Sequence, residues 1–185
     1  MLCTAVTAHL NQYSLLKSSQ HGFVTHRSCL TNLLQYFETL SNLLDQGHSV
    51  DAFYLDFSKA FDRVPHQRLL SKLKAHGITG PILTWIKSWL SGCKQKVVLN
   101  GSSSGWSSVS SGVPQGSVLG PLLFIIFIND IDNAVDVVHW LLLKFADDTK
   151  GLHVVDSAAD AVKLQSDIDS LFKWSVDWKM LFNLD

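Results

Sequence analysis

The spacing of apolar residues along the chain predicts mostly helices, interrupted by a few strands. A stripe of leucines and one phenylalanine at helical spacing predicts a helix from Ser28, as its N-cap, to about Asp45. Similar patterns predict helices over residues 66–76, from Pro81 to just before Gly92, and over 118–131. A last helix is predicted over residues 157–178. The residues expected to face inward from it are Ala161, Leu164, Ile168, Leu171 and Phe172.

Strand signals lie between these helices. Residues 50–57 are rich in β-branched and aromatic side chains, which predicts a buried strand ending at Asp56-Phe57. Two hairpins are predicted, the first from residues 95–99 and 106–110 around Asn100-Gly101. The second joins residues 140–146 to 149–155 around Asp147-Asp148. Because this order has no regular βαβ repeat, it predicts an α+β fold with helices packed on one face of a mainly antiparallel sheet.

Length and composition fit one folded domain. The chain has 185 residues, of which 46% are hydrophobic and 17% charged, and this excludes a disordered or fibrous protein. The most apolar run, residues 118–128, is too short for a membrane span, so a buried helix is expected there. Three cysteines without a C-x-x-C pair fit an intracellular, reducing compartment, with nucleus and cytoplasm left open, and do not suggest a disulfide framework or a zinc site.

Charge is distributed unevenly, although the formal net charge is only −1. Residues 1–100 hold ten Lys or Arg against five Asp or Glu, whereas residues 101–185 hold five against eleven. Residues 59–96 contain eight basic side chains and one acid, Asp62. A polyanion could lie along this stretch. Taken alone, the run favours the ordinary alternative, which is the solvated faces of two helices and a strand.

Three carboxylates are the main candidates for chemistry. Asp56 ends an otherwise apolar strand, and Asp147 and Asp148 are adjacent at a predicted turn. Neighbouring acids repel each other, and a divalent cation relieves that repulsion. Mg²⁺ prefers hard oxygen ligands, and two such ions about 3.5–4 Å apart can activate an attacking hydroxyl and stabilise a leaving pyrophosphate. An isolated Asp-Asp before Thr is more often a solvated turn. The acids therefore indicate a metal site only in combination with the segments around them.

Those segments resemble three palm motifs of the reverse transcriptases of non-LTR, LINE-like retrotransposons. The first is Tyr-Leu-Asp-Phe-Ser-Lys-Ala-Phe-Asp-Arg-Val-Pro-His, residues 54–66. The second is Ser-Gly-Val-Pro-Gln-Gly-Ser-Val-Leu-Gly-Pro-Leu-Leu-Phe, residues 111–124, and the third is Phe-Ala-Asp-Asp, residues 145–148. Their order and spacing match the family, and residues 20–23 resemble its lead-in to the palm. The resemblance, which covers roughly residues 14–185, implies a reverse-transcriptase palm plus part of the fingers.

The resemblance also implies a role for each motif residue. Asp56 and Asp147 would be the principal metal ligands, with Asp148 completing the acidic cluster and the backbone carbonyl of Phe57 adding an oxygen. Gln115 and Gly116 would contact the nucleotide and the template; Gly116 alone also fits an ordinary turn glycine.

The residues after Asp56 would bind the nucleotide. The backbone of Ser58, Lys59, Ala60 and Phe61 would lie under the incoming triphosphate. The Phe61 ring matches the family's steric gate against a ribose 2′-OH, and by its sequence alone it fits a core aromatic better. The basic stretch 59–96 becomes a candidate wall for a template–primer duplex.

The resemblance divides the chain into residues 1–49, partial fingers and a lead-in helix, and residues 50–185, a palm that ends before the primer grip and thumb. It implies a domain truncated at both ends and an RNA-directed DNA polymerase that uses two Mg²⁺ ions, or Mn²⁺. This enzyme would add a dNTP to a DNA primer 3′-OH on an RNA template. The first alternative is a catalytically inactive, transposon-derived domain that keeps the fold, which the truncated ends favour. A weaker alternative is another Mg²⁺-dependent phosphoryl-transfer enzyme.

Overall fold

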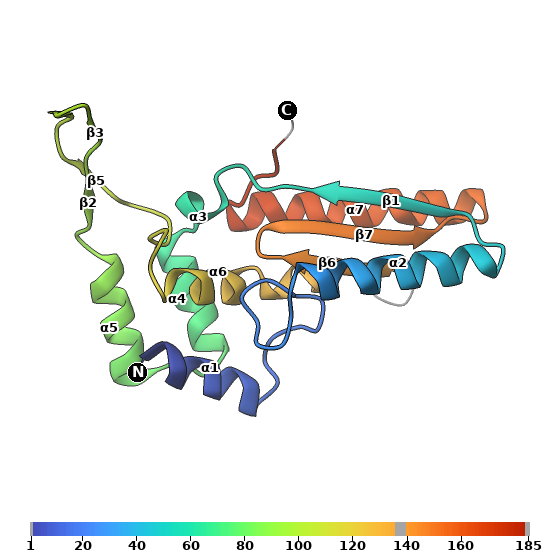
Figure 1. The fold of residues 1–185 in the computed structure, drawn as a ribbon, viewed down its shortest axis with the longest axis horizontal. Helices are drawn as coiled ribbons and strands as arrows, with labels where there is room; N and C mark the ends of the chain where they lie inside the picture. Colours follow the sequence, from blue (N-terminus) through green and yellow to red (C-terminus); the bar gives the residue numbers. More distant parts are fainter. Residues whose placement is uncertain (1, 136–139, 184–185) are drawn as a thin grey trace.

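A three-stranded antiparallel sheet forms the middle of the molecule. The computed structural model describes residues 2–135 and 140–183. The sheet has the order β1-β7-β6, with β1 at Val50–Leu55, β7 at Asp148–Val154 and β6 at Trp140–Phe145 (Figure 1). β1 comes from the first third of the sequence, and it pairs with β7 along its full length. The central strand therefore joins two parts of the chain that are about a hundred residues apart.

Helices make up most of the rest of the described chain. They are α1 (Leu2–Gln12), α2 (Cys29–Asp45), α3 (Ala60–Arg63), α4 (His66–Ala75), α5 (Gly80–Leu90), α6 (Gly120–Phe127), the 3₁₀ helix η1 (Asn129–Ala134) and α7 (Ala158–Trp178). The predicted helices are confirmed, and α2 and α7 begin after the N-caps Ser28 and Ser157. The helix predicted over 118–131 is shorter, because Pro121 lies in its first turn and the chain tightens into η1 after Phe127. Neither α1 nor α3 was predicted.

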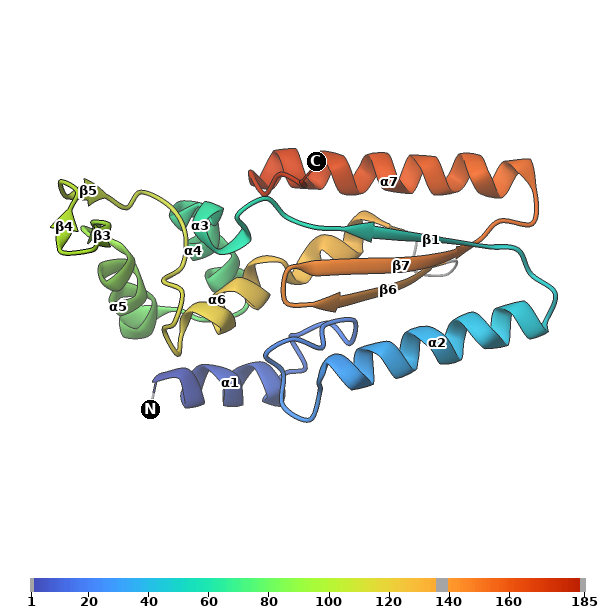
Figure 2. The same ribbon diagram turned by 45° about the horizontal axis from the view of Figure 1, so that its top comes forward.

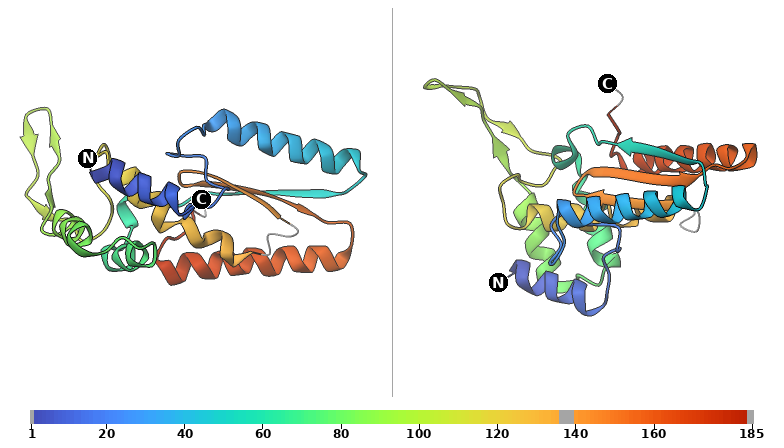
Figure 3. Two further views of the ribbon diagram at one scale, coloured as in Figure 1. Left: turned by 90° about the horizontal axis from the view of Figure 1, so that it is seen from below. Right: turned by 45° about the vertical axis from the view of Figure 1, so that its right-hand side comes forward.

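Helices cover both faces of the sheet. Figures 2 and 3 show the sheet between α2 on one side and α7 on the other. Since side chains alternate along a strand, Leu143 faces α2 and packs with Tyr36, whereas its neighbour Leu142 joins the main core. That core also contains Leu171 of α7 and nearly all of α6. The α+β class and the antiparallel sheet are confirmed, and α2 adds a second helical layer beyond the single one expected.

In α2 and α7, the residues that are buried differ from those that the apolar spacing predicts. The apolar stripe of α2 is largely exposed, because the helix meets the sheet through buried Asn32 and Tyr36. Asn32 donates to the carbonyl of Lys144 over 3.2 Å, so a polar contact fixes the helix to β6. In α7, Leu164 and Leu171 are buried as expected, but Phe172 is 47% exposed and Ala161 is also exposed. Asp167 and Trp174 are buried instead, which moves the inward face of α7 around the helix axis.

A narrow arm projects from one end of the molecule (Figures 1 and 3). It consists of two short ladders, β2 (Lys94–Gln95) with β5 (Ser107–Ser108) and β3 (Val98–Leu99) with β4 (Ser102–Ser103). At its tip, Asn100 and Gly101 have φ angles of 49° and 79°, as a type I′ turn requires. The first predicted hairpin is thus confirmed, with an interrupted ladder. In the part of the chain that the structure describes, no helix is long and apolar enough to cross a membrane.

The buried ammonium of Lys72 links α4 to α7 and to the end of α6. Lys72 of α4 is 4% exposed, and its ammonium lies 3.7 Å from the ring centroid of Trp178 and 4.8 Å from that of Trp174. It also forms an ion pair with Asp130 and donates to the carbonyl of Phe127. Burial lowers the pKa of this ammonium to about 8, although Asp130 opposes the shift.

The stability of the fold should therefore rise with pH through the titration of Lys72. The unfolded chain holds this proton up to its ordinary pKa of 10.5, whereas the folded chain releases it at about 8, so alkaline pH favours the folded state. The free energy of unfolding of the wild type and of Lys72→Met can be measured in urea at several pH values. From the folded-state pKa of about 8 up to the ordinary pKa of 10.5, the value for the wild type should rise by about 3 kcal/mol relative to that of the variant. A constant difference would contradict this account of Lys72.

Candidate active site

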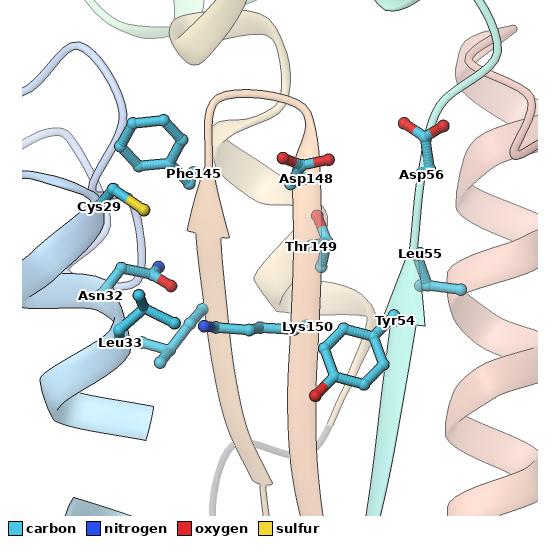
Figure 4. A pocket seen from close by; sticks show the side chains of 11 residues that line it. Cys29, Asn32, Leu33, Tyr54, Leu55, Asp56, Phe145, Asp148, Thr149 and Lys150 are labelled. Carbon is cyan, nitrogen blue, oxygen red and sulfur yellow. The ribbon is translucent and has the colours of Figure 1, made fainter. Parts of the chain in front are cut away.

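Two carboxylates lie side by side where neighbouring strands end. Asp56 is the first residue after β1, and Asp148 is the first residue of β7. Leu55 pairs with Thr149, so the next step in the antiparallel register places Asp56 beside Asp148. Figure 4 shows the two carboxylates on adjacent strands, Asp148 at the start of β7 and Asp56 just past the end of β1. They line an open cavity of about 320 Å³ between this edge of the sheet and the first turns of α2.

The third acid lies in the turn between β6 and β7. Phe145 pairs with Asp148, so Ala146 and Asp147 are the two loop residues. The predicted hairpin is confirmed, but its turn is one residue earlier than the Asp147-Asp148 turn predicted. Ala146 takes a left-handed φ of 56°, as two-residue hairpin turns need at their first loop position. The tight turn separates the two acids, with Asp147 half-buried in the loop and Asp148 exposed on the strand.

The three carboxylates interact electrostatically. Burial raises the pKa of the Asp147 carboxyl above its ordinary value of 3.8, the charges of Asp148 and Asp56 raise it further, and a backbone hydrogen bond opposes the shift. Within residues 2–135 and 140–183, none of the three acids forms an ion pair. Negative charge therefore accumulates at this edge of the sheet.

Oxygen donors of this kind suit Mg²⁺ or Mn²⁺. Asp56 and Asp148 give two such donors on adjacent strands, and Asp147 is near enough for its pKa to respond to both. Among the residues that the structure describes, no three His, Cys, Asp or Glu side chains are gathered closely enough to hold a metal ion. The site therefore has oxygen donors of the right kind, coupled through charge, but in this arrangement three of them do not converge on one point.

The chain after Asp56 is held by the C-terminal segment. Phe57 is buried, and its ring stacks on that of Phe182 with centroids 4.8 Å apart. The carbonyl of Asp56 accepts from the Asn183 N–H over 2.8 Å, and the Ser58 N–H donates to the carbonyl of Leu181 over 3.0 Å. The hydrogen bonds of this bridge do not use the carbonyl of Phe57. The Phe57 side chain is part of the core.

The next residues turn sharply into α3. Lys59 has a left-handed φ of 52° and precedes the helix, and Ser58 is half-buried. Ala60 is 4% exposed, so it offers almost no surface of its own to a ligand. The half-buried Phe61 ring stacks on Phe124 at 4.5 Å between centroids and meets the exposed Phe23 ring edge-on at 6.3 Å. Phe61 is therefore supported by the core without being enclosed by it.

The second sequence motif packs directly on the first. Val113 donates its N–H to the carbonyl of Phe61 over 2.7 Å, and Gly112 donates to Val64 over 2.8 Å. A Cβ on Gly112 would lie 2.8 Å from the backbone of Asp62, and φ is 92° there, so this approach requires glycine. As a result, Gln115 and Lys59 line one cavity of about 650 Å³. Gly116 is exposed with a φ of 78°, which fits its turn.

Sequence reasoning gave no role to two residues next to the acidic turn. Gln20 and Gly22 contact Ala146, and a parallel bridge links Gln20 to Lys144 of β6. The only available signal was the resemblance of residues 20–23 to the lead-in of the palm motifs.

Comparison with known proteins agrees with this arrangement. Residues 2–185 match the sequence profile of the family described as "Reverse transcriptase (RNA-dependent DNA polymerase)". The chain belongs to the reverse transcriptase family. An RNA-directed DNA polymerase from the mobile element jockey of Drosophila funebris is 34% identical to it over 173 residues, which are 89% of this chain and 18% of that protein. The jockey polymerase of Drosophila melanogaster is 30% identical, over 100% of this chain and 20% of that protein.

The family's fold is also found among solved structures. Telomerase from Candida albicans, solved with a fragment of telomeric RNA, matches 98% of this chain and 34% of its own with a TM-score of 0.73 at 12% sequence identity. This likeness supports the palm-like α+β fold of the reverse transcriptase chain. The chain spans about a fifth of the length of the two jockey polymerases.

Removing the charge of Asp147 should stabilise the fold at neutral pH. The folded state binds the Asp147 proton more tightly than the unfolded state, so ionisation of this carboxyl opposes folding as pH rises through its raised pKa. Asp147→Asn should therefore have a higher melting temperature than the wild type at pH 7. The gain should shrink as pH falls toward 3.8. A variant less stable than the wild type at pH 7 would contradict the raised pKa.

Proposed function

We propose that this chain is the core of an RNA-directed DNA polymerase that transfers a nucleotide from a dNTP to the 3′-OH of a primer. The observation that carries the proposal is the meeting of Asp56 and Asp148 at adjacent strand ends, with Asp147 coupled to both. Membership of the reverse transcriptase family supports the reaction type. The polymerase relatives extend well beyond the region matched here, so the activity of the whole protein is part of the proposal.

In this proposal the acidic edge holds the metal ions. Asp56, Asp147 and Asp148 provide carboxylate oxygens, and the backbone carbonyl of Phe57 provides a further one. Two bound Mg²⁺ ions would supply Lewis-acid activation of the primer hydroxyl and neutralise the leaving pyrophosphate. The repulsion among the three carboxylates supports this assignment, because a cation relieves it.

The nucleotide would lie beside the acids, over the backbone of residues 58–61. Ser58, Lys59, Ala60 and Phe61 follow Asp56 directly and turn into α3, and Lys59 and Gln115 share one cavity. Lys59 places a positive charge there for a triphosphate, and the open turn at Gly116 lies next to Gln115. The Phe61 ring acts as the steric gate against a 2′-OH, which its position between Phe124 and the exposed Phe23 supports.

An RNA template and a DNA primer would lie along the basic stretch 59–96. Its members on α5 and the arm are exposed, and Lys96 also lies over the ring of Trp106; they are Lys87, Lys94 and Lys96. Exposed lysines of this kind can contact phosphates. Residues 1–49 would serve as partial fingers with a lead-in helix, and residues 50–185 as the palm. Three cysteines outside any disulfide support an intracellular location, nuclear or cytoplasmic.

Primer extension on an RNA template with Mg²⁺ tests the proposal. The wild-type chain should extend the primer, and Asp147→Ala should lower the rate by about a hundredfold or more, because a metal ligand is lost. Asp51→Asn is the matched control, since it removes an exposed acid at the other end of the same strand and should leave the rate unchanged.

The outcomes separate the proposal from its main alternative. Folded wild-type protein that neither extends a primer nor is stabilised by Mg²⁺ would support an inactive domain that keeps the fold. Equal activity in the wild type and Asp147→Ala would place the chemistry elsewhere.

Reducing the Phe61 ring should weaken discrimination against ribonucleotides. In Phe61→Val a 2′-OH would find room, so the dNTP to rNTP ratio of kcat/KM should fall by about tenfold or more. Phe172→Val is the control, because it shortens an exposed ring of α7 to which the proposal gives no role, and it should leave the ratio unchanged. An unchanged ratio in Phe61→Val would assign Phe61 to the core alone.

A further inference from the structure

The turn that carries Asp147 is bound by a side chain from a distant part of the sequence. Gln20 donates through Nε2 to the carbonyl of Ala146 over 3.2 Å. Its Oε1 accepts from the N–H of Ala146 over 3.0 Å and from the N–H of Gly22 over 2.8 Å. One amide thus satisfies both backbone groups of the residue immediately before Asp147.

These hydrogen bonds form out of contact with water. Gln20 is 2% exposed and Ala146 is 7% exposed. A buried amide is costly unless its donors and acceptors are paired, so each of these bonds matters more than an exposed one. The same bonds fix a residue that needs support, because Ala146 has the left-handed φ of 56° that non-glycine residues rarely adopt.

Close packing reinforces the clamp. A Cβ built on Gly22 would lie 2.2 Å from the backbone nitrogen of Ala146 and 3.0 Å from the carbonyl carbon of Phe145. Any larger residue at this position would push the turn away. The segment around Gln20 therefore fits against the turn both by hydrogen bonds and by shape.

The clamping segment is itself anchored on two sides. Lys144 of β6 donates its N–H to the carbonyl of Ser19, and His21 donates its N–H to the carbonyl of Lys144, both over 2.8 Å. The His21 ring also hydrogen-bonds to Thr31 and Gln35 of α2. Beneath this bridge, the buried ammonium of Lys144 pairs with Asp132, which also accepts from Ser19. Figure 2 shows the loop between α1 and α2 lying beside β6.

From this geometry we infer that Gln20 is a positioning residue that sets the conformation of the Ala146-Asp147 turn and thereby the place of the Asp147 carboxylate. The effect of Gln20 on catalysis rests on the proposed function. Gln20 touches no reacting group and acts through the backbone of Ala146. Asp147 follows Ala146 directly, so hydrogen bonds that fix both backbone groups of Ala146 also fix where Asp147 leaves the turn.

Hydrogen exchange followed by NMR tests the clamp directly. In Gln20→Met, which keeps the length of the side chain without its hydrogen bonds, the Ala146 amide should exchange about tenfold faster than in the wild type. Gln20→Glu keeps an acceptor for the Ala146 and Gly22 N–H groups and should retain part of the protection. Asn32→Ala is the matched control, because it removes another buried amide that hydrogen-bonds to β6, at Lys144, and should leave Ala146 protected.

Primer extension by the Gln20 variants tests the consequence for chemistry. Gln20→Met should lower kcat by about tenfold with little change in KM for dNTP, because the metal-binding turn moves while the nucleotide surface stays. Asn129→Ala is the activity control and should keep kcat, because it removes a buried amide that hydrogen-bonds to Leu15 and Lys17 and lines neither cavity. Melting temperatures show that each variant is folded, and Gln20→Ala replaces Gln20→Met if the latter is not.

Each result has one meaning. The clamp is overturned if the Ala146 amide of Gln20→Met exchanges at the wild-type rate. It is also overturned if Asn32→Ala loses as much protection at Ala146 as Gln20→Met does. Faster exchange with unchanged kcat overturns the positioning role. A folded wild type that extends no primer contradicts the proposed polymerase, and the exchange measurement still decides whether Gln20 holds the turn.

Discussion

The antiparallel pairing of β1 with β7 is the constraint on which the site depends. It runs from Val50↔Val154 to Leu55↔Thr149, and it brings residue 56 beside residue 148 across almost a hundred positions of sequence. A shift of this register by one residue would turn Asp148 to the other face of the sheet and separate it from Asp56. β7 is mostly buried, whereas every residue of β1 is half-buried or exposed, so packing specifies the register mainly through β7.

The acidic edge opposes folding, and the surrounding structure compensates for it. Asp56 and Asp148 are neighbours and their charges act on Asp147, without a compensating ion pair among the described residues. Asp147 is half-buried and follows Ala146, which has a left-handed φ. Support comes from polar contacts that are themselves buried: Gln20 on Ala146, Asn32 on Lys144 and the Lys144–Asp132 pair. The fold thus gives up stability to hold negative charge in one place, as functional sites often do.

Much of the fold could be predicted from local patterns. The ends of α2 and α7 were predicted nearly correctly from serine N-caps and apolar spacing, and the arm was predicted from the Asn100-Gly101 turn. These signals act within a few residues. The burial of side chains was less predictable. Phe172 is exposed and Asp167 buried because the face a helix hides depends on its neighbours, and those come from elsewhere in the chain. The turn at Ala146 was placed one residue late, since the Phe145↔Asp148 pairing that defines it is a tertiary feature.

By itself the sequence determined which acids were candidates and which family motifs surround them, because side-chain chemistry and motif spacing are written in the chain. Only the tertiary structure decided that Asp56 and Asp148 share an edge, that Asp147 occupies the turn, and that Gln20 grips its backbone. These facts depend on pairing between residues up to about 126 positions apart, and such pairing is set by the packing of the whole core. No local signal in the sequence carries that information.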